Sequence, residues 1–223
     1  MPKSFKIPSK SSNINQIDHI PNQKAVPWEL PPIWKFDFDQ DYQPLVEYVS
    51  RLEFIENMRN LRTKQNDLLD HDVMKELKQF CLTCCQHYQS EVRGSSHKIL
   101  LEQSWANLAN QGDSHHEHFH PNSYLSGVFY LKNDANTSIT FHNNTLIERY
   151  FWSQAPAQDL EGSYPSRMDE VNFLAPAGCL IVFCSKMNHS VEIQEEDTPR
   201  LSLSFNTSLE RPYGDYNGLT LIR

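Results

Sequence analysis

Hydrophobic positions change their spacing along the chain near residue 95. Before that point apolar residues recur every three or four positions, which predicts two amphipathic helices, over 44–62 and 72–92. Ahead of them, residues 31–39 alternate apolar and polar side chains as an edge strand does. After residue 95 the apolar residues alternate with polar ones, which is typical of half-buried strands. Turn residues separate most of about eight strands predicted over 97–108, 116–131, 138–142, 148–152, 171–174, 179–184, 190–194 and 201–209.

This order of elements predicts the fold class and the domain organisation. Helices followed by many short strands indicate a mainly β barrel or sandwich with helices packed on one side. A length of 223 residues fits a single domain with one large core. We expect residues 1–27, which are polar, to form a flexible N-terminal arm. Residues 28–223 then form one domain, with a helical preface over 40–93 and a β core over 97–210.

Composition and charge argue against nucleic acids and membranes as partners of this protein. The 20 basic and 28 acidic side chains give a net charge of −8, which argues against nucleic-acid binding. No apolar run approaches the ~18 residues of a membrane span, and the first residues lack the apolar segment of a signal peptide. Five cysteines without such a signal indicate reduced thiols, so we expect a cytoplasmic protein with no membrane partner. Cys81 and Cys84 have CxxC spacing, but inside the second predicted helix this spacing favours a buried helix face.

Histidines carry the first chemical signal. Four of the ten lie between positions 115 and 120. His118 and His120 are two residues apart, so on a strand their side chains point to the same face and can reach one metal ion. His189, just after the apolar strand 179–184, is the candidate third ligand. A surface histidine tract is the alternative, but this run is internal and leads into a strongly alternating strand.

The last predicted strand carries the second signal. Arg200, Ser202 and later polar residues fall on one face, and leucines and a phenylalanine fall on the other. Polar side chains facing a barrel interior indicate a polar ligand there, and arginine suits a carboxylate. A surface ion pair on an edge strand is the alternative for Arg200. Tyr130 has the parity of His118 and His120, so an unbroken strand would point its hydroxyl into the same cavity.

Several of these segments together resemble a known family. Residues 118–131, HFHPNSYLSGVFYL, resemble the signature of a subgroup of Fe(II)/2-oxoglutarate-dependent oxygenases found mainly in bacteria and phages. Residues 176–185, PAGCLIVFCS, resemble the family's PxxGxLxxFPS strand. HSV at 189–191 and RLSLSFN at 200–206 resemble its distal HxV and RxSxxFN motifs. The similarity covers roughly residues 97–210, in the family's order.

The resemblance implies a fold, cofactors and site residues. The fold is a double-stranded β-helix, or jelly roll, with N-terminal helices packed on the major sheet. The cofactors are Fe(II), 2-oxoglutarate as co-substrate and O₂, and the activity is that of an oxygenase, most simply a hydroxylase. The implied metal ligands are His118, His120 and His189. The implied ligands of the distal carboxylate of 2-oxoglutarate are Arg200, Ser202 and Tyr130. Residues implied to line the barrel are Trp105, Ile181 and Leu203.

One position departs from the family's pattern. The usual metal triad is two histidines and a carboxylate in the form HxD/E…H, but here the second position is His120. Either three histidines bind the metal, or the register shifts to His115-His116-Glu117, a literal HxE, or water replaces His120. The Pro-Asn-Ser that follows favours the three-histidine alignment.

Substrate selection is expected in the stretch 143–172, which is aromatic and basic. It could form a lid that contacts a small-molecule or peptide substrate, or a hairpin that caps the barrel end. The candidate substrate contacts are Arg149, Trp152 and Tyr164. The aromatic tail 211–216 could close the site or form the contact of a homodimer.

A second function remains open at this stage. Three-histidine metal sites also occur in β-barrels of cupin type that do not use 2-oxoglutarate, either as dioxygenases or as non-catalytic metal-binding modules. Only the oxygenase hypothesis needs a carboxylate clamp, so Arg200 and Tyr130 discriminate between the two.

Overall fold

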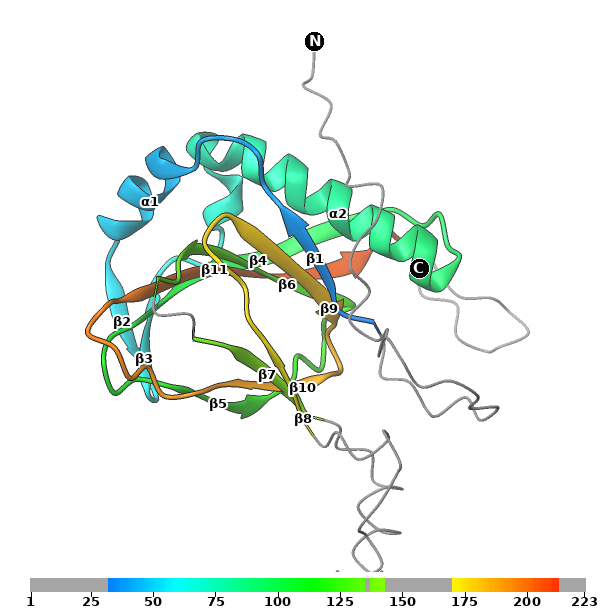
Figure 1. Cartoon of the computed structure of the whole chain (residues 1–223). Helices are drawn as coiled ribbons and strands as arrows, with labels where there is room; N and C mark the ends of the chain where they lie inside the picture. Colours follow the sequence, from blue (N-terminus) through cyan, green and yellow to red (C-terminus); the bar gives the residue numbers. More distant parts are fainter. Residues whose placement is uncertain (1–31, 135–136, 143–169, 213–223) are drawn as a thin grey trace, which may run out of the picture.

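The computed structural model describes residues 32–134, 137–142 and 170–212 (Figure 1). The helices are α1 (Gln43–Ser50) and α2 (Lys75–Arg93), with 3₁₀ turns at Leu68–Asp70 and Asp72–Met74. The first strands are β1 (Trp34–Asp37), β2 (Phe54–Asn57), β3 (Asn60–Thr63), β4 (Ile99–Ala109) and β5 (His115–His118). The later strands are β6 (Leu125–Lys132), β7 (Ile139–His142), β8 (Glu170–Phe173), β9 (Cys179–Cys184), β10 (Asn188–Val191) and β11 (Arg200–Leu209).

Two antiparallel sheets form the body of the molecule. The large sheet has the strand order β1-β9-β6-β11-β4-β3-β2, and the small sheet has the order β5-β10-β7-β8. Both helices lie on the outer side of the large sheet, and the small sheet lies on its other side (Figure 1). This mainly β fold with helices on the major sheet confirms the predicted fold class, as an open two-sheet arrangement rather than a closed barrel.

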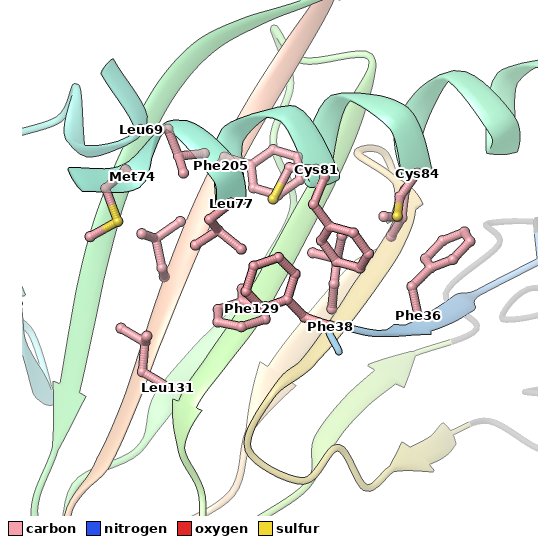
Figure 2. Packing of buried hydrophobic residues seen from close by; sticks show 14 of the residues in the cluster. Phe36, Phe38, Leu69, Met74, Leu77, Cys81, Cys84, Phe129, Leu131 and Phe205 are labelled. Carbon is pink, nitrogen blue, oxygen red and sulfur yellow. The ribbon is translucent and has the colours of Figure 1, made fainter. Parts of the chain in front are cut away.

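The outer core lies between α2 and the large sheet. The buried stripe of α2 includes Leu77, Cys81 and Cys84, which face Phe129 and Phe205 of the sheet (Figure 2). All five cysteines are buried and free, so Cys81 and Cys84 form the buried helix face that their spacing favoured. Burial of this apolar surface stabilises the packing of α2 on the outer face of the large sheet.

The inner core lies between the two sheets and borders the candidate site. It includes Tyr130, Phe141, Ile181 and Phe183. Alternation along β6 and β11 therefore sends odd-numbered residues to the helices and even-numbered residues to the inside. Leu203 belongs to the outer core, so the expectation that it lines the barrel was wrong.

The N-terminal strand and the later strands agree closely with the predicted ones. β1 is an edge strand of the large sheet, and β9 occupies the predicted residues 179–184. β4, β7, β8, β10 and β11 differ from their predicted limits by a few residues. The predicted strand 148–152 and the N-terminal arm 1–27 lie outside the described residues.

Two elements differ from the prediction. The first helix ends at Ser50, and the rest of its predicted range forms the β2–β3 hairpin. An apolar pair such as Phe54-Ile55 is compatible with a helix or a strand. Here β2 pairs with β3, and β3 pairs with β4 of the large sheet, so this segment forms a strand. The predicted strand 116–131 is two strands, β5 and β6, which belong to different sheets. The parity argument for Tyr130 was therefore wrong, although its side chain does reach the interior.

Neither helix among the described residues combines the length and the apolar character needed to cross a membrane.

Candidate metal centre

Three histidines converge on one point between the sheets. His118 ends β5 and is the register partner of His189 in β10, and His120 follows in the turn after β5. One ring nitrogen from each lies within 4.8 Å of the others. The ring centroids of His118 and His189 are 4.3 Å apart, and that of His120 lies 5.1 and 5.2 Å from theirs. The structure thus brings together the three histidines that the resemblance implied, from two strands and a turn.

Backbone hydrogen bonds fix which ring nitrogen is free in two of these histidines. Nδ1 of His118 lies 2.8 Å from the carbonyl oxygen of His116, and Nδ1 of His189 lies 3.0 Å from that of Met187. A carbonyl only accepts, so each Nδ1 carries the proton and each Nε2 keeps its lone pair. This is the usual arrangement of metal-binding imidazoles, whose other nitrogen donates to an outer partner.

The surroundings keep the three imidazoles neutral. Burial, and then proximity to His118, lower the pKa of His120 to about 4. Burial also lowers the pKa of His118, and it lowers that of His189, which is 4% exposed, well below its usual range. Neutral imidazoles are the form that binds Zn, Cu, Fe and Ni, so the donor set fits such an ion.

Hydroxyl groups hold the turn that carries His120. The backbone N–H of His120 donates to the carbonyl of Ser185 at 2.8 Å. The hydroxyl of Ser185 donates to that of Ser123 and lies 2.8 Å from that of Ser126. Ser126 in turn donates to Oδ1 of Asn206. This chain of hydrogen bonds connects the turn to β6, β9 and β11. Several polar residues of the sequence motifs therefore position the turn that carries His120.

No carboxylate joins the three histidines within the described part of the chain. The side chain of Glu117 is exposed, and it accepts a hydrogen bond from Asn188 at 3.0 Å. A second group of histidines, His115, His116 and His118, also has ring nitrogens within 4.8 Å of one another. Both groups need His118, which has one free nitrogen, so one ion at a time can use it.

A buried arginine faces the same cavity from the large sheet. Arg200 begins β11 and is 3% exposed. Ser202 follows on the same face, and its register partner on β6 is Tyr130, which is 1% exposed. Burial raises the pKa of Tyr130 to about 12, although the charge of Arg200 opposes this rise. The cavity that these three residues line also contains His118, His120 and His189.

The Arg200 charge has no protein partner in the described residues. No acidic side chain there forms an ion pair with it, and its Nε has no hydrogen-bond partner. Arg200 is therefore not part of a surface ion pair, which was the alternative role for this residue. A buried guanidinium is costly without an anion, so this end of the cavity fits a carboxylate.

Sequence reasoning missed one polar residue of the cavity, Asn107, and gave another, His115, only as a possible metal ligand. Asn107 of β4 lines the cavity and donates to Ser204, while its Oδ1 is buried without a partner. Its alternation with Trp105, which also lines the cavity, was the available signal. His115 lines it as well. The candidate substrate contacts Arg149, Trp152 and Tyr164 lie outside the described residues.

A family model matches the part of the chain that forms this site. Residues 103–206 match the model described as "Putative 2OG-Fe(II) oxygenase". The core of this chain is similar to the 2OG-Fe(II) oxygenases. No curated protein matches the sequence.

Solved structures of this family share the fold. A prolyl-4-hydroxylase from Pseudomonas putida has a TM-score of 0.51 and 14% identity, over 78% of this chain and 91% of that one. HygX from Streptomyces hygroscopicus, with nickel, 2-oxoglutarate and hygromycin B bound, has a TM-score of 0.54 and 11% identity, over 78% and 82%. The epimerase SnoN from nogalamycin biosynthesis, in complex with Fe³⁺, alpha ketoglutarate and nogalamycin RO, has a TM-score of 0.54 and 16% identity, over 78% of each chain. The jelly-roll fold predicted from the sequence motifs is thereby confirmed.

Proposed function

We propose that this protein is a cytoplasmic Fe(II)- and 2-oxoglutarate-dependent oxygenase that hydroxylates its substrate. The observation that carries the proposal is a buried, unpartnered Arg200 in the same cavity as three neutral histidines. A metal-binding group at one end and a carboxylate-binding group at the other match the two ends of 2-oxoglutarate. The family model over residues 103–206 supports the same activity.

Metal binding and carboxylate binding would use different parts of the fold. His118, His120 and His189 would hold the iron through their free nitrogens and leave its other positions open. On the large sheet, the residues that would bind the distal carboxylate are Arg200, Tyr130 and Ser202. When bound, iron and 2-oxoglutarate supply O₂ activation, in which one oxygen atom enters a substrate C–H bond while 2-oxoglutarate gives succinate and CO₂.

Aromatic side chains pack against two of the three histidines, His120 and His189, and shield them in part from water. The rings of Phe183 and Phe141 lie 4.9 and 6.0 Å from that of His189, centroid to centroid. The ring of Trp105 lies 6.1 Å from that of His120. Exclusion of water strengthens the hydrogen bonds and charges inside the site and protects reactive species.

A wide groove beside His120 is where we place the substrate. It has a volume of about 920 Å³ and runs along the ends of β4 and β11. Its walls carry the carboxamides of Gln103, Asn122 and Asn206, which both donate and accept hydrogen bonds. Because His120 lines both the groove and the inner cavity, a substrate in the groove would present a C–H bond toward the metal.

An anaerobic titration tests the proposal. Fe(II) followed by 2-oxoglutarate should produce a weak visible charge-transfer band, and addition of O₂ should then yield succinate. His189→Ala should abolish metal binding, because it removes the most buried of the three ligands. Arg200→Ala should spare metal binding and weaken 2-oxoglutarate binding. Absence of both the band and succinate from the wild-type protein would refute the oxygenase activity.

The same titration separates the alternative function. A cupin-type metal protein that does not use 2-oxoglutarate would bind the metal through the same histidines and show no response to the co-substrate. Burial of Arg200 without a partner favours the oxygenase, because the alternative gives that charge no role.

A further inference from the structure

An extra residue in β5 turns a fourth histidine into the cavity. His118 pairs with His189, and His115 pairs with Val191, so three steps along β5 match two along β10. In a regular strand, residues three apart point to opposite faces. The bulge turns His115 to the same side as His118, and both line the cavity together with His189 and Val191.

His115 lines the cavity beside the metal-binding histidines, and Arg200 lines the same cavity. Its ring stacks on that of His118, with centroids 4.5 Å apart and an interplanar angle of 20°. The charge of Arg200 is among the causes that lower the pKa of His115, after burial and the neighbouring histidines His118 and His116. Among the described residues no hydrogen bond to the ring of His115 is present, so its N–H can donate to a ligand.

We propose that His115 binds 2-oxoglutarate directly, by donating a hydrogen bond from its imidazole to a carboxylate oxygen of the co-substrate. The inference rests on the proposed function, which places this dicarboxylate between Arg200 and the metal-binding histidines. His115 lines the cavity that such a molecule would occupy, and its ring stacks on that of His118 at the metal-binding end. A hydrogen bond to a carboxylate is charge-assisted, so it contributes more than one between neutral groups.

Nickel-loaded protein provides the test, because co-substrate binding can then be measured without turnover. Calorimetric titration with 2-oxoglutarate should show a roughly tenfold to hundredfold loss of affinity in His115→Leu, which removes the donor. His115→Gln keeps an N–H donor of similar reach, so its affinity should stay close to that of the wild type. The matched control is His116→Leu, which removes the exposed neighbouring imidazole and should leave the affinity unchanged.

Nickel affinity, measured for each variant, completes the experiment. It should be unchanged in all of them, since the proposal gives His115 no metal. Loss of nickel in His115→Leu would mean that the group containing His115 and His116 holds the ion, and would overturn the inference. Equal 2-oxoglutarate affinity in His115→Leu and the wild type would also overturn it, while the proposed function stands. If the nickel-loaded wild type binds no 2-oxoglutarate, the proposed function fails and the inference fails with it.

Discussion

At the scale of single residues, burial of Arg200 lowers the stability of the ligand-free protein but prepares a site for an anion. Its guanidinium is buried, and Nε lacks a partner in the described structure. Desolvation also lowers its pKa, which expresses the same cost of burial. Such a charge opposes folding of the empty protein and becomes useful when an anion binds beside it.

Replacement of this charge should therefore stabilise the protein and impair binding. Arg200→Met keeps a similar volume without the charge, so the free energy of unfolding of the metal-free protein should rise by about 1–3 kcal/mol. Loss of the charge-assisted bonds should weaken 2-oxoglutarate binding to the nickel-loaded protein by at least about tenfold. Urea denaturation and calorimetry measure the two effects. A destabilised variant with intact binding would show that Arg200 has a structural partner instead.

The histidine pKa values predict how metal binding depends on pH. A metal-binding imidazole must be neutral, and burial lowers the pKa of His118, His120 and His189 from the ordinary value, to about 4 for His120. Nickel affinity should thus fall less between about pH 7.5 and 5.5 than it would with ordinary imidazoles, and the loss due to protonation of His120 should come only as the pH nears about 4. Ordinary imidazoles would lose about tenfold per histidine over the same range. A steep loss near pH 6.5 would contradict this prediction.

The same shifts set the sign of the stability change. Below about pH 6.5 these histidines take up protons more readily in the unfolded chain than in the folded, metal-free protein. Stability should therefore fall as the pH is lowered from 6.5 toward 4, which urea denaturation at several pH values can measure.

At the scale of elements, β6 and β11 pack through a glycine and an aromatic ring. Gly127 is the register partner of Phe205, whose ring covers the glycine on the side of the helices. A Cβ added at Gly127 would lie 2.2 Å from Cζ of Phe205. The strand that carries Tyr130 into the cavity thus depends on the absence of a side chain three residues earlier.

Introduction of that side chain should disturb the core. Gly127→Ala should lower the free energy of unfolding by about 1–3 kcal/mol, because the ring must move. Phe205→Leu removes the overlap but leaves a cavity, so the double variant should be more stable than the sum of the two single changes predicts. Denaturant unfolding of the four proteins measures this coupling. Additive effects would show that the ring does not restrict position 127.

At the scale of the whole molecule, the site joins the two sheets. Two of the proposed metal ligands, His118 and His189, belong to the small sheet, whereas Arg200 and Tyr130 belong to the large one. A co-substrate that reaches from the metal to Arg200 would cross-link them. Metal and 2-oxoglutarate together should therefore stabilise the fold more than either does alone.

Thermal unfolding with nickel and 2-oxoglutarate tests this linkage. At a concentration of 100 times its Kd, a ligand adds about 2.7 kcal/mol, which for a chain of this size raises Tm by roughly 5–10 °C. The metal-free protein should show little response to 2-oxoglutarate, and His189→Ala should show none. A full shift without metal would contradict the bridging arrangement.

The sequence predicted the fold better than it predicted the details of the site. Alternation located most strands, since the side chain of each residue takes a fixed face of its own strand. It could not separate β5 from β6, because both alternate and only the turn near Pro121 sends them to different sheets. The hairpin β2–β3 was missed because pairing with β4 overrides an ambiguous local pattern.

By itself, the sequence determined the residue types, the alternation of the strands and the family resemblance of the core. Only the tertiary structure decided that His118 and His189 pair across two strands, that Arg200 is buried without a partner, and that a bulge turns His115 inward. The physical reason is that periodicity fixes the face of a side chain within one strand. Which strands become neighbours, and where a bulge shifts their register, depends on packing of the whole chain.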